Sequence, residues 1–194
     1  MTLPTWVPDL EEKPAPMPLL LPQSFVNTLD RETGGDLLAR EADARGWLIE
    51  TGLLTATAAA EVTSAELRQA REVREAIRAL ISHDPLTDAE LTSLESVLTQ
   101  AETPLDITRD GQVKLCAGPA DRLVDGLAIL LVMIRDAQAD GTWDRLKLCA
   151  NPDCRWAFYD RSHSRRGAWC NMTTCGNKIK NRNLRARQRE SQRG

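Results

Sequence analysis

Two pairs of cysteines near the end of this 194-residue chain constrain its fold more than any other feature. Four residues separate Cys149 from Cys154 and Cys170 from Cys175, and fifteen residues lie between the pairs. Two close pairs joined by a linker of this length are typical of a structural Zn²⁺ site, in which four thiolates surround the metal. Residues 151–153 form turns readily, which suits a tight metal-binding knuckle. We therefore predict one structural Zn²⁺ on these four cysteines.

Two alternatives to a metal site are a core of buried thiols and disulfides. The polar, basic sequence between the pairs disfavours a thiol core, and a reducing compartment disfavours disulfides. His163 is an alternative ligand, but its Ser-His-Ser-Arg-Arg surroundings favour a solvated or phosphate-facing side chain. Cys116 lies outside the cluster and is interpreted as a core thiol. Four thiolates close the coordination shell, which leaves no position for a catalytic water.

Positive charge is concentrated in the same segment. Residues 145–194 carry 13 lysines and arginines against 3 acidic residues, whereas residues 1–144 carry 12 against 25. The net charge of −3 conceals this asymmetry. A basic segment attached to an acidic body points to a polyanionic partner.

The segment after Cys175 is predicted to be a helix with one basic face. At 100° per residue, the side chains of Lys178, Arg182, Arg185 and Arg189 lie within about 60° of one another. Such a face usually meets nucleic-acid phosphate. Three asparagines beside it, Asn177, Asn181 and Asn183, could read adenine edges in a major groove, and three linker arginines could reinforce the phosphate contacts. The additional residues predicted as nucleic-acid contacts are Asn177, Asn181, Arg161, Arg165 and Arg166.

The same helix has an apolar side and a less specific interpretation. Ile179 and Leu184 point away from the basic face, and we expect them to dock the helix on the zinc module. A solvated, frayed C-terminal tail is the alternative, because a run of charges alone is weak evidence for a binding face.

Before residue 145 the pattern predicts a mainly α (α+β) fold: a helical N-terminal domain with one β-hairpin. Short helices are expected at 24–30, with Ser24 as the N-cap, and from Asp36, as its N-cap, to Gly52, with Leu37 and Leu38 on the buried side. Two capping boxes, Thr63 with Glu66 and Thr87 with Glu90, open longer helices. Leu91, Leu94, Leu98 and Ala101 are the expected buried positions of the second. Alternation at 103–116 predicts the hairpin. An apolar helix from Pro119 to Ala139 is expected at the centre of the core.

Three segments result. Residues 1–22 hold six of the ten prolines and are expected to form an extended, weakly ordered arm. Residues 23–144 form the helical domain. Residues 145–194 form a small treble-clef-like zinc module with a strand near 156–159 and the basic helix at its end. No run is long and apolar enough for a signal peptide or a bilayer span, so a cytoplasmic protein without membrane contact is expected.

The C-terminal sequence "CANPDCRWAFYDRSHSRRGAWCNMTTCGNKIKNRNLRARQR" resembles the CGNR zinc finger. The motif reads Cys175-Gly176-Asn177-Lys178, so lysine replaces the final arginine; the charge is kept and the bidentate fork is lost. Upstream, "FVNTLD", "DLL", "WLIETGLL" and "VREAIRALI" are similar to the ABATE domain that accompanies this finger. The family is regarded as stress-responsive transcription regulators. The resemblance implies DNA binding by the finger and a sensing role for the helical domain.

These observations predict a zinc-containing DNA-binding transcription regulator that is not an enzyme. Its expected partners are double-stranded DNA, a small-molecule ligand of unknown identity and a second copy of the chain. The candidate ligand-pocket residues are Asn27, Asp30, Arg31 and Arg74, for which ordinary structural roles are the preferred alternative.

Two other classes of function are weighed against the regulator. The runner-up is an RNA-binding or ribosome-associated protein whose aromatics at Trp156, Phe158, Tyr159 and Trp169 stack on bases. An enzyme is disfavoured, since His83 is the single histidine before residue 145 and no catalytic motif is present.

Overall fold

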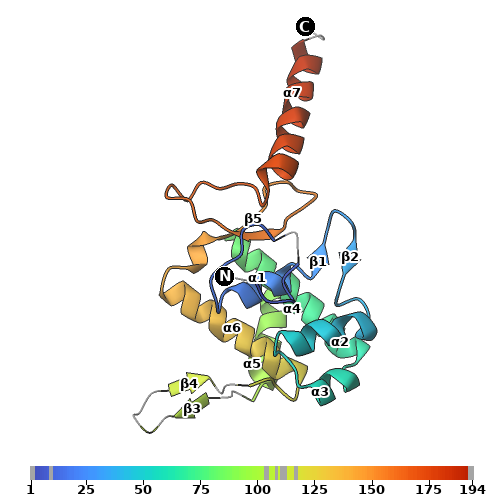
Figure 1. Ribbon diagram of the computed structural model, residues 1–194, viewed down its shortest axis with the longest axis vertical. Coiled ribbons are helices and arrows are strands. Elements are labelled where there is room, and N and C mark those ends of the chain that lie inside the picture. Colours follow the sequence, from blue (N-terminus) through green and yellow to red (C-terminus); the bar gives the residue numbers. More distant parts are fainter. Residues whose placement is uncertain are drawn as a thin grey trace.

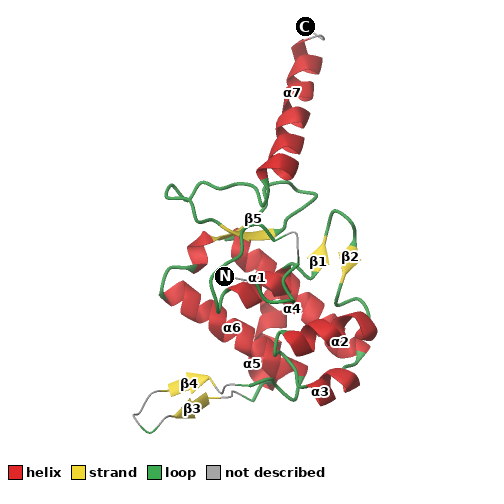
Figure 2. Cartoon of the chain, viewed as in Figure 1, coloured by secondary structure: helices red, strands yellow, loops and turns green. Residues whose placement is uncertain are grey.

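The computed structural model describes the chain except residues 1–2, 9–10, 103–104, 108, 110–112, 116–117 and 192–194, and the side chains of 105–107, 113–115, 183, 186–187 and 189–191. Helices predominate in this part (Figure 1, Figure 2). They are α1 (Leu20–Val26), α2 (Glu41–Glu50), α3 (Ala56–Glu61), α4 (Ser64–Ser82), α5 (Asp88–Gln100), α6 (Leu123–Ala139) and α7 (Asn177–Ser191). The predicted mainly α fold is confirmed.

The strands are short and pair in three antiparallel sets. They are β1 (Leu29–Asp30) with β2 (Gly35–Asp36), β3 (Leu105–Ile107) with β4 (Val113–Leu115), and β5 (Leu146–Leu148) with β6 (Ala157–Tyr159). The hairpin predicted at 103–116 is β3–β4, and β6 is the strand predicted beside the metal site. The prediction of a single hairpin in the N-terminal domain missed β1–β2, which is too short to show alternation.

Both capping boxes are present and open α4 and α5. Helix α4 packs against α1, α5, α6 and β5, and its predicted apolar face at Leu67, Val73, Ile77 and Ile81 is buried. Helix α6 shares the centre of the core, although it begins at Leu123 and not at Pro119. The capping boxes therefore predicted the starts of α4 and α5 correctly, and the apolar pattern predicted α6 except for its first residues.

Helix α5 buries less of its surface than expected. Leu94 and Val97 are buried, but Leu91 is 45% and Leu98 62% exposed. The helix packs against α4 and α6, so a single stripe of it meets the body. The expectation that Leu91 and Leu98 are buried is therefore wrong. Cys116, interpreted as a core thiol, lies outside the described residues.

The N-terminal proline-rich arm is packed against the body in its described residues, and the expectation of weak order is wrong. Val7, Ala15 and Leu19 are buried in the main core. The helix expected from Ser24 begins at Leu20, and Ser24 lies buried inside it, where it cannot act as a cap. Prolines interrupt the helical periodicity of a sequence, but the apolar side chains between them can still be buried against the rest of the protein.

The sequence suggested that Asp36 caps a helix, but α2 begins at Glu41, so this expectation is wrong. Instead, Asp36 ends the β1–β2 hairpin, and its carboxylate accepts hydrogen bonds at 2.6 and 2.9 Å from the guanidinium of Arg74. A bidentate, charge-assisted pair is stronger than a helix cap. Leu37 and Leu38 lie in a turn after β2, in which Leu37 is 41% exposed and Leu38 is buried.

The hydrophobic core continues across residue 144 into the zinc module. In the β5–β6 pair, Leu146 lies opposite Tyr159 and Leu148 opposite Ala157. Leu146, Ala157 and Tyr159 are buried in the same cluster as the helical body. Strand β6 packs against α1 and β5 against α4, so the module rests on the body through its strands, while α7 projects away (Figure 1).

None of the helices in the described residues is both long enough and apolar enough to cross a membrane.

Candidate metal centre and nucleic-acid interface

The first cysteine pair is carried by the turn between β5 and β6. Cys149 follows β5, and its N–H donates to the carbonyl of Trp156 at 2.9 Å. The knuckle then closes on Asn151, whose carbonyl accepts from the N–H of Cys154 at 3.0 Å and of Arg155 at 3.1 Å. Arg155 has a left-handed φ of 53°. This turn directs the first two thiols to one side of the hairpin.

The second pair lies at the start of α7. Cys175 sits in a single π-helical turn, Met172–Gly176, and Asn171 caps this turn by accepting from the N–H of Thr174 at 2.9 Å. Cys170 approaches from the loop before the turn. A strand turn and a helix N-terminus therefore supply two ligands each, which is the treble-clef-like arrangement predicted.

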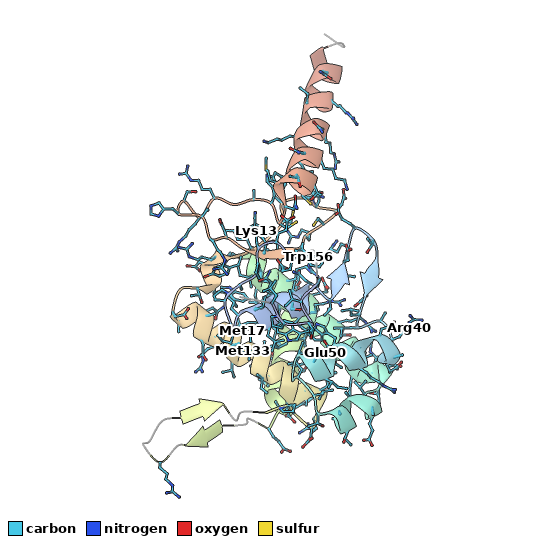
Figure 3. The ribbon with its side chains drawn as sticks, in the orientation of Figure 1. Lys13, Met17, Arg40, Glu50, Met133 and Trp156 are labelled. Atoms are coloured by element: carbon cyan, nitrogen blue, oxygen red, sulfur yellow. The ribbon has the colours of Figure 1, made fainter. Side chains whose placement is uncertain are left out.

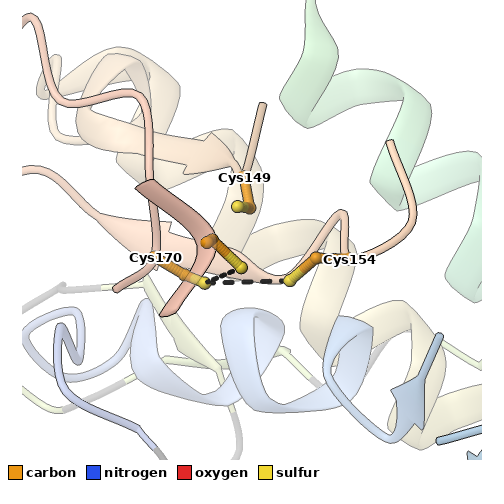
Figure 4. Close-up of side chains that lie close together, drawn as sticks. Cys149, Cys154 and Cys170 are labelled. Carbon is orange, nitrogen blue, oxygen red and sulfur yellow. Dashed lines mark hydrogen bonds between the residues drawn. The ribbon is translucent and has the colours of Figure 1, made fainter. Parts of the chain in front are cut away.

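The four thiols form one cluster (Figure 4). All Sγ atoms of Cys149, Cys154, Cys170 and Cys175 lie within 4.8 Å of one another. The Sγ of Cys170 is 3.7 Å from that of Cys154 and 3.8 Å from that of Cys175. A tetrahedron with metal–sulfur distances of about 2.3 Å has sulfur–sulfur edges of about 3.8 Å. The donor set thus has the size and chemistry of a structural Zn²⁺ site, and disulfides are absent among these four residues.

Without a metal, the thiols share protons unequally. The hydrogen bond between the two side chains lowers the pKa of Cys149 and raises the pKa of Cys154. Hydrogen bonds to Cys149 and Cys154 raise the pKa of Cys170 as well. These three thiols therefore do not titrate independently, and a divalent cation would offset two of the four thiolate charges.

Groups around the thiols fix the ligands. Asn151 is fully buried, and its amide N–H donates to the Sγ of Cys175 at 3.7 Å. A Cβ on Gly176, the glycine of the motif, would lie 2.5 Å from the sulfur of Met172, so the Met172 side chain would have to move. His163 is exposed in the linker and is not part of the cluster.

The linker between the pairs is anchored by Asp160. Its carboxylate accepts from the N–H of Gly167 at 2.7 Å and from Lys147 Nζ at 2.9 Å. Although burial alone would raise it, hydrogen bonds from Ser162, Lys147 and Gly167 lower the pKa of Asp160. A Cβ on Gly167 would meet this carboxylate at 2.8 Å. The loop that presents the linker arginines is therefore held by a buried anion.

Two family models match the chain, one for each part. The CGNR zinc finger matches residues 145–188. The ABATE model, described as "Putative stress-induced transcription regulator", matches residues 21–140. The chain belongs to the ABATE family. A search among curated proteins finds no match. The resemblance recognised from the sequence is confirmed in both families and in their order, and the CGNR match supports a structural zinc on the cysteine cluster.

The ABATE domain holds the zinc module through a buried polar junction. Asn27 accepts from the N–H of Ala157 at 2.8 Å and donates to its carbonyl at 2.8 Å, as a neighbouring strand would. Asn27 also donates to Glu11 Oε2 at 3.0 Å, and the indole of Trp156 donates to the same oxygen at 2.9 Å. Burial raises the pKa of Glu11. Lys13 and Trp156, which are labelled in Figure 3, show where this junction lies.

The predicted nucleic-acid contacts divide into three groups. Lys178, Asn181, Arg182 and Arg185 line one groove of about 590 Å³ along α7. Asn177 is exposed beside it and donates to the carbonyl of Thr173. The side chain of Arg189 lies outside the described residues.

The three linker arginines are also exposed. Arg161 already has local partners, because it donates to the carbonyl of Pro14 at 2.8 Å and lies over the ring of Tyr159. Arg165 and Arg166 have exposed side chains and remain candidates for phosphate contacts.

The expectation that Leu184 docks α7 on the zinc module is wrong. Leu184 is 55% exposed, because the helix leaves the module after its first turn and extends into solvent (Figure 1). Ile179, in that first turn, is half-buried.

The candidate ligand-pocket residues do not line a single cavity. Asn27 and Asp30 line a cleft of about 540 Å³, whereas Arg31 lines another of about 320 Å³. Arg74 lines neither, and its guanidinium is bound by Asp36, Glu75 and the hydroxyl of Thr28. Asn27 and Arg74 thus make structural contacts, and a ligand-binding role for the four residues stays a prediction.

Sequence reasoning missed Glu11, Glu32 and Asp160, which support the site from outside the ligand set, and it gave Asn151 a role in the turn but not its hydrogen bond to Cys175. Asn151 and Asp160 lie within the finger match, where a turn residue and an acid inside a basic segment were available signals. No local signal identifies Glu11 or Glu32, because each acts on residues more than a hundred positions away.

Proposed function

We propose that this chain is a zinc-containing, DNA-binding transcription regulator, in which the CGNR module places α7 on duplex DNA. The observation that carries the proposal is the groove lined by Lys178, Asn181, Arg182 and Arg185 on a helix that projects from an acidic body. Its cations suit phosphates, and its asparagine suits an adenine edge. In this function the zinc fixes the first turn of α7. The ABATE domain binds a ligand or a second copy of the chain and so controls DNA binding by α7.

The runner-up, RNA binding through stacked aromatics, has weaker support. Phe158 and Tyr159 are buried in the module, and Trp156 and Trp169 are half-buried beside the thiols. Stacking on unpaired bases requires exposed rings. Duplex DNA therefore fits the exposed surface better than single-stranded RNA does.

The decisive experiment measures the affinity of the zinc-loaded full chain for duplex DNA over a range of salt concentrations. Four to six phosphate contacts imply a log–log slope of roughly −4 to −5. The double variant Arg182→Ala/Arg185→Ala should flatten the slope by about two units and weaken all sequences alike. Arg40→Ala/Arg45→Ala removes the same charge from exposed positions of the ABATE domain and should leave the slope unchanged. Salt-independent binding of duplexes together with tight binding of structured RNA would contradict the proposal.

Sequence preference provides a second readout. Asn181→Ala should relax preference at one base pair, by about 1–3 kcal/mol if the amide makes a bidentate contact. Arg182→Ala should not change the preferred sequence, because a contact to a phosphate does not depend on the base sequence. Selection of binding sites from a randomised duplex pool by the two variants separates these outcomes.

A further inference from the structure

The β1–β2 hairpin of the ABATE domain contacts the first turn of α7. Glu32 Oε1, at the tip of this hairpin, accepts a hydrogen bond from Lys178 Nζ at 2.9 Å. The amide of Asn151 is directed at the same oxygen, at 3.4 Å. Lys178 also lines the groove that continues along α7 to Arg182 and Arg185. A carboxylate of the acidic domain thus already occupies one cation of the basic face.

The tip that carries Glu32 has a defined conformation. Asp30 Oδ1 accepts from the N–H of Glu32 at 2.9 Å, and Asp30 Oδ2 accepts from the hydroxyl of Thr33 at 2.8 Å. Gly34 follows with a φ of 77°, a left-handed conformation that favours glycine. The position of Glu32 is therefore set by the hairpin and not only by its attraction to Lys178.

The hairpin is in turn fixed to the interior of the ABATE domain. Asp36, at its far end, forms the two-bond pair with Arg74, whose side chain is 3% exposed. Arg74 lies on α4, in the centre of the body. Two ion pairs, one at each end of the hairpin, therefore join it to α4 and to α7.

The ion pair with α7 is weak enough to exchange. The side chains of Lys178 and Glu32 are 59% and 36% exposed. An exposed ion pair changes an equilibrium constant by about 1.5- to 5-fold. The contact is therefore a poor structural fastener, but it offers Lys178 the same kind of oxygen acceptor that a phosphate offers.

We propose that Glu32 is an intramolecular competitor for nucleic-acid phosphate at Lys178, through which the ABATE domain lowers the affinity of α7 for duplex DNA. This inference rests on the proposed function. A phosphate that binds Lys178 must displace the Glu32 carboxylate, and the two anions repel each other across the ammonium group. Any movement of the hairpin away from α7 removes the competitor. The contact thus makes the affinity of the basic helix depend on the position of an ABATE element.

The test compares variants of the zinc-loaded full chain for binding to a short duplex of mixed sequence, from low to moderate salt. Glu32→Gln should bind about 2- to 5-fold more tightly and steepen the log–log salt slope by up to about 0.9, because no displaced carboxylate takes up a cation. Glu12→Gln is the matched control. Its carboxylate accepts from the Asn171 amide and not from a cation, so the same charge change should leave binding unchanged. In a Lys178→Gln background, Glu32→Gln should have no effect.

Each outcome decides between the two claims. If the wild type binds duplex DNA and Glu32→Gln binds identically, or if Glu12→Gln gains as much affinity, the competition is overturned and the proposed function stands. If neither the wild type nor Glu32→Gln binds any duplex, both claims are overturned. A gain confined to Glu32→Gln and dependent on Lys178 supports the inference.

Discussion

Removing the Asn27 side chain tests the junction between the ABATE domain and the zinc module most directly. The side chain is 4% exposed and forms three hydrogen bonds, two with the backbone of Ala157 and one with Glu11. In Asn27→Ala the N–H of Ala157 loses its partner, and the buried Glu11 carboxylate loses one donor. The carbonyl of Ala157 still accepts from Gln23, so its loss is partial.

The magnitude follows from these losses. A buried donor left without a partner costs about 1–3 kcal/mol, and a lost hydrogen bond to a charged group costs a similar amount. After partial relaxation we expect a destabilisation of about 2–4 kcal/mol, a large part of the about 5–15 kcal/mol that stabilises a typical domain. For a chain of this length the melting temperature should fall by roughly 5–15 °C.

The assay is chemical and thermal unfolding of the zinc-loaded chain, followed by circular dichroism. Asn181→Ala is the matched control, because this asparagine is exposed on α7 and its removal should change stability by less than about 0.5 kcal/mol. A loss below that limit for Asn27→Ala would refute the view that its amide joins the two parts.

Three further predictions concern the metal, a buried acid and a close helix contact. Cys154→Ser should lose zinc and unfold the finger while α4 and α5 stay helical; metal analysis showing full occupancy would rule out the assigned ligand set. Burial raises the pKa of Glu11, so its protonation contributes stability that is fully present below the unfolded value and lost as pH rises through the folded one. The stability of Glu11→Gln relative to wild type should therefore increase from acidic to neutral pH in parallel melting curves, and a constant difference would contradict this. Gly126→Ala places a Cβ 2.5 Å from the carbonyl oxygen of Leu53 and should destabilise by about 1–3 kcal/mol, whereas Gly46→Ala, with open space around it, should not.

Local signals in the sequence predicted much of the fold and the metal ligands. Thr63 with Glu66 and Thr87 with Glu90 specify helix starts within four residues, and the cysteine spacing specifies a metal site within one segment. Predictions from such features succeed because the interacting residues are close in the chain. The predictions that failed depend on contacts between residues that are far apart in the chain.

Asp36 shows how a distant contact overrides a local signal. Its sequence neighbourhood favours a cap, but the guanidinium that binds it belongs to a residue 38 positions away. Likewise, Leu19 is buried although the prolines around it hide any period. The hairpin contact of Glu32 with Lys178 spans 146 positions, and no pattern in one sequence records such a pairing.

The geometry of α7 explains how an acidic protein can present a basic face. Residues 1–144 carry more than twice as many acidic as basic side chains, and this field would weaken phosphate binding near the body. A helix of 15 residues is about 22 Å long, whereas electrostatic interactions are screened over about 8 Å at physiological salt. Arg185 lies about 12 Å along the helix axis from Asn177, beyond one screening length, whereas Arg182 lies about 7.5 Å from it, at about one screening length. Lys178, in the first turn, lies closest to the body, and there the structure supplies Glu32. The projection of the helix thus weakens the influence of the acidic domain on its outer residues, and the one direct ion pair between them in the described residues is the contact at which Glu32 is proposed to compete with phosphate.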